Sequence, residues 1–238
     1  MTKSVRYSGR VALLYPVSID VADRPVLVVG GGAVASRKVA SLVECGARLT
    51  VVAPTVTKAI DELEARGVLV AERRPYRRGE VSAYRLVVTA TGHPDVDGQV
   101  ATDAESAGVW VNAADDVRHC SVQLPAIHRE GPVTIAVSTG GESPALARWL
   151  RDRLADVAGA NLGVLATLLG ASRTRLHASG RRLETARWLA LLEGPLPALV
   201  EAGDFGAARH LLDAALGTGE AGPTAVRQVH PTSRSERR

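Results

Sequence analysis

The sequence predicts an α/β fold, in which a doubly wound parallel sheet is followed by a small β-hairpin and an all-helical C-terminal region. Up to about residue 112, short runs rich in Val and Leu alternate with helical patterns, as in consecutive βαβ units. Two strand-like runs then follow each other with no helix between them. Beyond residue 161 the chain is rich in Leu and Ala, without strand patterns.

These changes of pattern divide the chain into four expected parts. We expect a Rossmann-type domain over 11–115, a strand hairpin over 116–142, a helical domain over 143–216 and a disordered tail over 217–238.

The first strand and the turn after it carry the clearest motif. Val26 to Val29 are four consecutive apolar residues that run directly into Gly30, Gly31 and Gly32 and then into a helical pattern. With Ala35 the spacing is G-x-G-x-x-A, the dinucleotide-binding fingerprint, although glycine-rich turns also occur as simple loops. Because the first N–H groups of a helix attract phosphate, we predict cofactor contacts at 30–34, that is at Gly30, Gly31, Gly32, Ala33 and Val34.

The rest of the first half follows in βαβ order. An extended lead-in or short strand is expected at 15–21, and a helix from the glycine turn to Cys45, ended by Gly46. Further strands are predicted at 49–53, 68–72, 86–90 and 109–112, and helices at 57–66 and 95–107.

The second half starts with strand-like runs at 121–127 and 133–137, which we interpret as a hairpin. A second glycine turn, 138–144, follows, with Ser143 placed as an N-cap and Pro144 as the first helical residue. Helical breaks are expected near Gly180, Gly194–Pro195 and Gly203.

Composition limits the possible functions. The chain has 238 residues, 46% of them hydrophobic, and a net charge of +4. It has no apolar run of the roughly 20 residues that a membrane span needs and no signal-peptide pattern, so we expect a cytoplasmic protein. Three Trp, four Tyr and one Phe offer little for base stacking, which favours an acidic small molecule over nucleic acid.

The adenosine end of the expected cofactor site lacks a usual feature. The second strand ends Val52-Ala53-Pro54, without the acidic residue that commonly holds the ribose. We therefore predict backbone contacts at Ala53 and Pro54 and a further contact at Thr91, after the fourth strand. The sequence does not distinguish NAD from NADP as the cofactor.

Asp115 follows the fifth predicted strand at the edge where open parallel sheets bind ligands. Its carboxylate could take up a proton or hold a metal ion, or could simply cap the next turn. His93, His119 and His128 lie near the same regions and could assist, or be ordinary surface or packed histidines.

Several segments in the same order resemble the dehydrogenase and ferrochelatase module of siroheme synthases. They include Val28-Val29-Gly30-Gly31-Gly32-Ala33-Val34-Ala35-Ser36-Arg37-Lys38, Gly46 to Pro54, Val111-Asn112-Ala113-Ala114-Asp115 and Ser138-Thr139-Gly140-Gly141-Glu142-Ser143-Pro144. The resemblance covers roughly 11–155. It implies NAD-dependent oxidation of precorrin-2 to sirohydrochlorin, with Fe²⁺ insertion as a further reaction, in a homodimer whose hairpin and helical regions interlock.

The resemblance also implies roles for individual residues. Asp115 matches the catalytic aspartate of the family and is the candidate metal-handling residue. The carboxylates of the tetrapyrrole substrate would be held by basic side chains and by the second glycine turn. The predicted substrate-binding residues are Arg118, Gly140, Gly141, Ser143 and Arg148, with Arg129 nearby.

The chain departs from the family pattern at two positions. Gly92-His93 stands where acidic residues are common, and Thr139 stands where some members have a phosphorylatable serine. The methyltransferase domain fused in some relatives is not expected in a chain of this length.

Three hypotheses remain open at this point. The chain is a precorrin-2 dehydrogenase with or without chelatase activity, a dehydrogenase of another anionic substrate, or a nucleotide-sensing module without catalysis.

Overall fold

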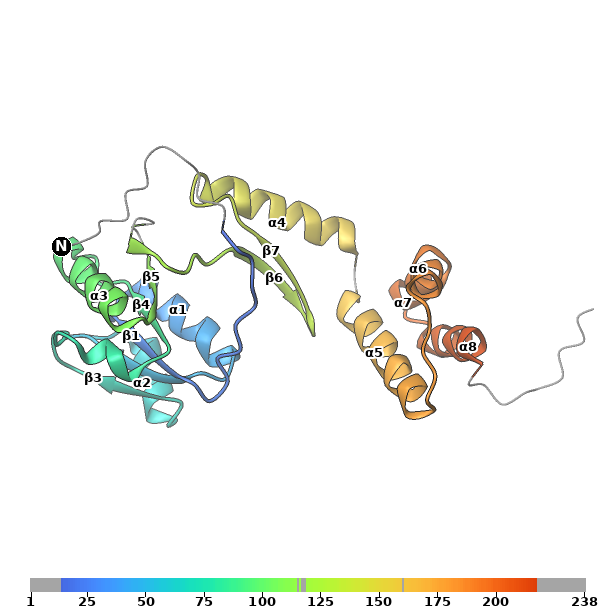
Figure 1. Ribbon diagram of the computed structural model, residues 1–238, viewed down its shortest axis with the longest axis horizontal. Coiled ribbons are helices and arrows are strands. Elements are labelled where there is room, and N and C mark those ends of the chain that lie inside the picture. Colours follow the sequence, from blue (N-terminus) through green and yellow to red (C-terminus); the bar gives the residue numbers. More distant parts are fainter. Residues whose placement is uncertain (1–13, 115, 117–118, 160, 218–238) are drawn as a thin grey trace, which may run out of the picture. The chain divides into compact units, whose positions relative to one another are not determined.

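The computed structural model describes residues 14–114, 116, 119–159 and 161–217 (Figure 1). The predicted disorder of the tail beyond Gly217 lies outside the described residues. The chain forms two compact units, the first comprising Met1–Ala126 with Ala136–Leu150 and the second Ile127–Ile135 with Arg151–Arg238. The four domain boundaries given above remain predictions.

The first unit is built on a five-stranded parallel sheet. Its strands are β1 (Pro25–Val29), β2 (Arg48–Val52), β3 (Leu69–Glu72), β4 (Leu86–Thr89) and β5 (Trp110–Ala113). They lie in the order β3-β2-β1-β4-β5, and each neighbouring pair is parallel. The chain thus reverses its direction of winding between β1 and β4, which confirms the predicted doubly wound sheet.

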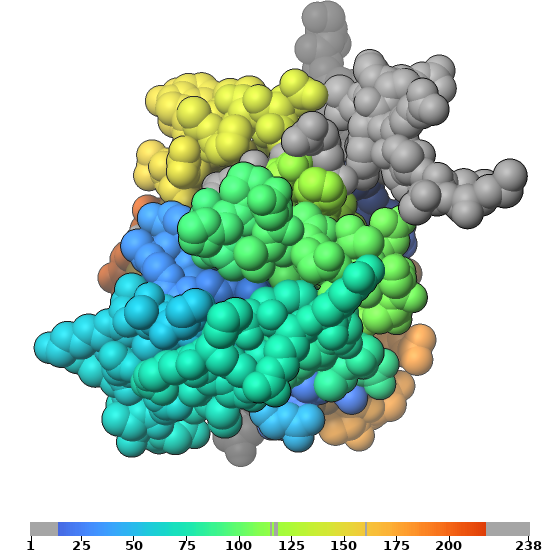
Figure 2. All heavy atoms as spheres, turned by 90° about the vertical axis from the view of Figure 1, so that its left-hand side faces the viewer, coloured from blue at the N-terminus to red at the C-terminus, as the bar shows by residue number. Residues whose placement is uncertain are grey.

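Helices cover both faces of this sheet, because successive side chains of a strand point to opposite faces. Val26 and Val28 of β1 pack with Val39 of α1 (Ala33–Glu44) and Ile60 of α2 (Lys58–Ala65). On the opposite face, Leu27 and Val29 pack with residues of α3 (Pro94–Ala107) and of the 3₁₀ helix η1 (Glu80–Ala83). In Figure 2, α3 forms the green surface beside the cyan-to-teal segment that leads from β3 to β4.

The helix ends follow the local sequence. The helix α1 ends at Glu44 with Cys45 as its C-cap, and Gly46 then adopts a left-handed conformation at φ 72°. The helix α3 begins at Pro94, whose fixed φ suits a first helical position, and Gly108 at φ 67° caps its C-terminus. Both ends were predicted within a residue or two.

The predicted strand at 121–127 starts too early. The structure places β6 at Ala126–Glu130 and β7 at Val133–Val137, as a separate two-stranded sheet. The preceding segment instead runs along β5: the N–H groups of Ser121 and Val122 both donate to the carbonyl oxygen of Val111 at 3.0 Å. The side chain of Ser121 also accepts from the Val111 N–H at 2.8 Å. These bonds cover the open edge of the sheet at β5. Because the segment pairs with β5, it is not part of the hairpin.

The helix α4 (Pro144–Ala158) starts where it was predicted. The hydroxyl oxygen of Ser143 accepts a hydrogen bond from the N–H of Leu146 at 3.2 Å, which confirms Ser143 as the N-cap. The lead-in at 14–20 is extended and forms no strand, and Ala22 makes a single antiparallel bridge with Ala47.

The second unit contains α5 (Leu162–Ala178), α6 (Thr185–Glu193), α7 (Leu196–Glu201) and α8 (Phe205–Leu216). Its core is built from leucines and small aliphatic residues of α5, α7 and α8, including Leu165, Leu176, Leu196, Val200 and Leu212. The helices break at the predicted glycines, and Asp204 caps α8 by accepting from the N–H of Ala207 at 2.9 Å.

No single helix of the described ranges has the length and apolar character needed to cross a membrane. The consecutive helices α4 and α5 would qualify only as a pair, by length and composition alone.

Candidate functional site: the glycine turn and the end of β5

Gly30 and Gly31 are required by the close approach of neighbouring loops. Gly30 has φ 122°, and a Cβ atom added to it would lie 2.3 Å from the carbonyl oxygen of Ala90. A Cβ atom on Gly31 would lie 2.0 Å from the carbonyl oxygen of Thr55. The turn therefore passes between the ends of β4 and β2 with no room for a side chain.

Gly32 is different, because a Cβ atom added to it would meet nothing within 4 Å. It is the N-cap of α1, no side chain caps this helix end, and its first turn contains no acidic residue. The N–H groups of the first turn, among them those of Ala33 and Val34, have no acceptor within the helix and lie at the positive end of the helix dipole. This is the cradle that a dinucleotide pyrophosphate requires, so the residues present fit NAD.

The segment after β2 is fastened to the glycine turn. The N–H of Gly30 donates to the carbonyl of Val52 at 2.9 Å, and the N–H of Thr57 donates to the carbonyl of Gly31 at 2.9 Å. Ala53 is buried between these bonds and Pro54 is exposed just beyond it. The structure therefore brings Ala53 and Pro54 next to the turn, while their contact with a ribose stays a prediction.

Thr91, the third part of the predicted cofactor edge, is held by Asp97 of α3. Its hydroxyl donates to Oδ1 of Asp97 at 2.8 Å and its N–H donates to the same oxygen at 3.2 Å. The hydroxyl of Thr89 donates to that oxygen as well. Sequence reasoning missed Asp97, which fixes the end of β4 beside the glycine turn. His93 occupies the N-cap position of α3, and its side chain makes no capping hydrogen bond.

A cavity of about 140 Å³ lies at the end of β5. Asn112 and Cys120 line it on the side of the strand, Lys38 reaches it from α1, and Thr139 and Gly141 line it from the second glycine turn. The cavity thus brings the helix that follows the first glycine turn, the end of β5 and the second glycine turn together. Gly141 was a predicted substrate-binding residue, whereas Lys38, Asn112 and Cys120 were not.

Asn112 carries an unsatisfied buried acceptor. The residue is 6% exposed, and its Nδ2 donates to the carbonyl of Val122 at 2.9 Å. Its Oδ1 atom is buried and has no hydrogen-bond partner among the described residues. Because buried polar atoms are normally paired, this unpaired oxygen makes Asn112 a candidate functional residue. The signal in the sequence was an amide side chain within the apolar run from Val109 to Ala114.

Cys120, at the C-terminal end of the loop that follows β5, is hydrogen-bonded to the last residue of that strand. Its Sγ atom accepts from the N–H of Ala113 at 3.2 Å and lies 3.2 Å from the carbonyl oxygen of the same residue, to which it donates. Burial raises the pKa of the Cys120 thiol, so the group stays protonated and serves as a structural clamp.

Two of the predicted site residues, Asp115 and Arg118, lie in this loop and outside the described residues. Close to them, Nδ1 of His119 lies 3.1 Å from Oδ2 of Asp116. In the second glycine turn, Gly140 and Gly141 have φ values of 63° and 90°. The hydroxyl of Thr139 is engaged with the backbone of Ser143, donating to its carbonyl at 3.1 Å and accepting from its N–H at 3.0 Å.

The remaining predicted substrate-binding residues lie around the start of α4. Ser143 uses its hydroxyl as the N-cap of this helix, and Arg148 is exposed one turn further on. Among the described residues, no group of three His, Cys, Asp or Glu side chains could hold a metal ion.

Comparison with known proteins agrees with this arrangement. Residues 17–126 match a family model described as putative NAD(P)-binding, and residues 130–156 match one described as sirohaem biosynthesis protein central. A solved structure described as SirC, precorrin-2 dehydrogenase, shares 26% sequence identity with a TM-score of 0.68, over 87% of this chain and 100% of its own.

Curated relatives are more similar in sequence. The siroheme synthase of Thioalkalivibrio sulfidiphilus is 38% identical over 207 residues, which are 86% of this chain and 42% of the relative. The siroheme synthase of Methylococcus capsulatus is 36% identical over 218 residues, 91% of this chain and 45% of the relative. The chain thus spans less than half the length of these relatives. The chain is thus homologous to siroheme synthases over most of its own length.

Proposed function

We propose that this chain is an NAD-dependent dehydrogenase that oxidises precorrin-2 to sirohydrochlorin in siroheme biosynthesis. The observation that carries the proposal is the position of two features in one unit. The uncapped N-terminus of α1 offers N–H groups to a pyrophosphate, and Asn112, whose buried Oδ1 has no hydrogen-bond partner among the described residues, lines a cavity at the end of β5. The precorrin-2 dehydrogenase that aligns over its whole length supports the choice of substrate.

The residues of the glycine turn bind the cofactor in this proposal. The N–H groups after Gly32 hold the pyrophosphate, and the backbone at Ala53 and Pro54 contacts the adenosine side. Thr91, fixed by Asp97, borders the site at the end of β4. When bound, NAD⁺ supplies the acceptor for a hydride.

The residues around the end of β5 act on the substrate. Oxidation removes a hydride and a proton, and we assign the proton to the carboxylate of Asp115, which lies outside the described residues. The Oδ1 atom of Asn112 accepts a hydrogen bond from an N–H donor in the site. Arg118 and Arg148 pair with substrate carboxylates, since guanidinium groups bind carboxylates through two parallel hydrogen bonds.

The test is to mix the full chain with precorrin-2 and NAD⁺ and to follow the absorbance of sirohydrochlorin. We expect turnover by the unaltered chain and none by Asp115→Ala, with nearly unchanged NAD⁺ affinity measured by calorimetry. Unchanged turnover of the variant would remove Asp115 from its role. If the unaltered chain binds NAD⁺ but does not oxidise precorrin-2, the nucleotide-sensing alternative is favoured.

Iron insertion is a separate prediction that rests on the resemblance to the family. Asp115 is again the candidate, as the residue that delivers Fe²⁺ and collects pyrrole protons. Adding Fe²⁺ to preformed sirohydrochlorin without NAD⁺ tests this reaction independently of the dehydrogenase.

We also propose that the chain works as a homodimer. The helix α4 carries exposed large apolar side chains at Leu146, Trp149, Leu154 and Val157, the last of them 85% exposed. Exposed apolar side chains on one helix are typical of protein interfaces. Light scattering after size-exclusion chromatography should give twice the mass of one chain, and a monomer at micromolar concentration would contradict the proposal.

A further inference from the structure

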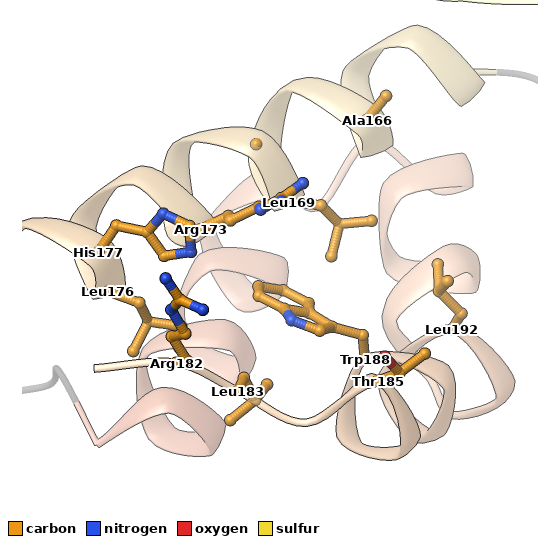
Figure 3. Close-up of a pocket in the computed structure, with 11 residues that line it drawn as sticks. Ala166, Leu169, Arg173, Leu176, His177, Arg182, Leu183, Thr185, Trp188 and Leu192 are labelled. Carbon is orange, nitrogen blue, oxygen red and sulfur yellow. The ribbon is translucent and has the colours of Figure 1, made fainter. Parts of the chain in front are cut away.

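A second, larger cavity lies wholly within the helical unit. It measures about 680 Å³ and is formed by α5, by α6 and by the segment that connects them (Figure 3). Cavities that bind small molecules usually measure about 300–1,000 Å³. None of its lining residues belongs to the glycine turn or to the cavity at the end of β5.

Small residues on α5 keep this cavity open. Ala166 and Gly170 lie one turn apart on the same face of α5, and a Cβ atom added to Gly170 would meet nothing within 4 Å. Opposite them, α6 contributes Trp188 and Leu192, again one turn apart, and α6 has no fully buried residue. The two helix faces therefore do not fill the space between them.

The cavity has a cationic end. Arg173 and His177 continue the same face of α5, and Arg182 enters from the connecting segment. Figure 3 shows His177 and Arg182 at one end of the cavity, Leu192 at the other, and the indole of Trp188 projecting between them.

The guanidinium groups of Arg173 and Arg182, two residues that line this cavity, have no acidic side chain as partner in the described part of the chain. Arg175, by contrast, also lies on α5 and is paired: its Nη2 atom is 3.0 Å from Oδ1 of Asp213. A pair of charged donors beside an apolar, aromatic wall is complementary to an anion that carries a flat ring.

We infer that this cavity binds a small aromatic carboxylate or sulfonate, with its ring against Trp188 and its anionic group at Arg173 and Arg182. Leu169 and Leu183 supply the apolar contacts for the ring. Two guanidinium groups match a ligand with one or two negative charges, and not the eight carboxylates of the tetrapyrrole proposed for the other site. The inference does not depend on the proposed dehydrogenase activity.

The test uses the dye 1-anilinonaphthalene-8-sulfonate, an aromatic anion whose fluorescence increases on binding. The full chain is titrated in the presence of saturating NAD⁺, and again as the Gly32→Asp variant, so that the nucleotide site is not measured. We expect one saturable site, with energy transfer from tryptophan that is reduced by Trp188→Phe.

Replacing both arginines, Arg173→Gln with Arg182→Gln, should weaken dye binding by about tenfold or more, because a hydrogen bond to a charged group contributes at least a factor of that size. Arg187→Gln is the matched control, since it removes the same charge from α6 at a position that does not line the cavity. Gly170→Leu should abolish binding by filling the space, and the absence of nearby atoms lets the helix accept it.

The uncharged dye N-phenyl-1-naphthylamine has similar rings without the sulfonate. It should bind more weakly and should not respond to the arginine changes. Each variant must show a cooperative thermal transition like that of the unaltered chain, which excludes dye binding to a partly unfolded state. Equal affinity for both dyes, or an equal loss of affinity in Arg187→Gln, would overturn the inference.

Discussion

The hydroxyl of Tyr76 donates a hydrogen bond to Oδ2 of Asp103 at 2.8 Å, which ties the connection between β3 and β4 to α3. The same oxygen accepts from the N–H of Gly79 at 2.8 Å, and Oδ1 accepts from Nε2 of Gln99 at 2.7 Å. Asp103 is only 8% exposed. A buried carboxylate with three hydrogen bonds makes the stability of this unit depend on pH.

Burial by itself would raise the pKa of Asp103, but the hydrogen bonds from Gly79, Tyr76 and Gln99 lower it by more, so the pKa lies below its ordinary value. A carboxylate whose pKa is lower in the folded state stabilises the protein above its unfolded pKa, about 3.9 for Asp, and this stability is lost as the pH falls through the lowered value. We expect the free energy of unfolding, measured with urea, to decrease below about pH 4.

Asp103→Asn should reduce this pH dependence and should cost about 1–3 kcal/mol at neutral pH, because the new amide places a donor among donors. Tyr76→Phe removes one hydrogen bond and should cost about 1 kcal/mol. An unchanged slope against pH in Asp103→Asn would show that other carboxyl groups control acid unfolding.

Replacement by alanine should destabilise the protein much more at Gly31 than at Gly32. Gly31→Ala places a Cβ atom 2.0 Å from the carbonyl oxygen of Thr55, so the backbone must move and stability should fall by at least about 2 kcal/mol. In Gly32→Ala the new Cβ atom meets no other atom. This variant should lose less than about 1 kcal/mol of stability, because alanine is a slightly poorer N-cap residue than glycine. Urea denaturation of both variants checks this, and equal losses would contradict the geometry of the turn.

Gly32→Asp should separate folding from cofactor binding. Aspartate is a favourable N-cap, so the variant should be at least as stable as the unaltered chain. Its carboxylate would lie where the pyrophosphate binds, and repulsion of about 4 kcal/mol between two charges 4 Å apart near a protein surface predicts NAD⁺ binding weakened by at least about a hundredfold. Gly32→Asn has the same shape without the charge and should weaken binding much less in calorimetry.

The unpaired oxygen of Asn112 predicts a specific loss of activity. Asn112→Ala should lower the rate of precorrin-2 oxidation by about tenfold or more, because a hydrogen bond to the bound reactants disappears. Ser121→Ala is the matched control, since it removes another bond between the same segment and β5, at a similar cost of about 1 kcal/mol in stability. If both variants lose activity equally, the role of Asn112 is structural.

A substitution that creates a void in the core of the helical unit should destabilise that unit and leave cofactor binding intact. Leu212 is 1% exposed, and Leu212→Ala should cost about 2–5 kcal/mol. Leu189 is 51% exposed on α6, and Leu189→Ala should cost less than about 1 kcal/mol. Because the helical unit contains no part of the glycine turn, NAD⁺ affinity measured below the unfolding temperature should not change in either variant.

The elements that the sequence predicted well are those with local signals. The helix from Ala33 to Glu44 begins after Gly32 and ends before Gly46, and α4 begins at Pro144, directly after its N-cap Ser143. Hydrophobic periodicity of 2 or 3.6 residues and capping residues act within one or two helical turns, so they can be recognised without knowing the neighbours in space. The strand predicted to start at Ser121 was wrong because the pairing of this segment is not local: its hydrogen bonds go to Val111, ten residues earlier.

The sequence by itself determined the βαβ order, the glycine turn that fits a dinucleotide and the breaks between the C-terminal helices, because these depend on short-range backbone preferences. Only the tertiary structure decided that Lys38, Asn112 and Gly141 share one cavity, that Cys120 clamps the loop after β5, and that Arg173 and Trp188 border a second cavity. These relationships join residues from different elements, and their distances are fixed by the packing of sheet and helices against one another.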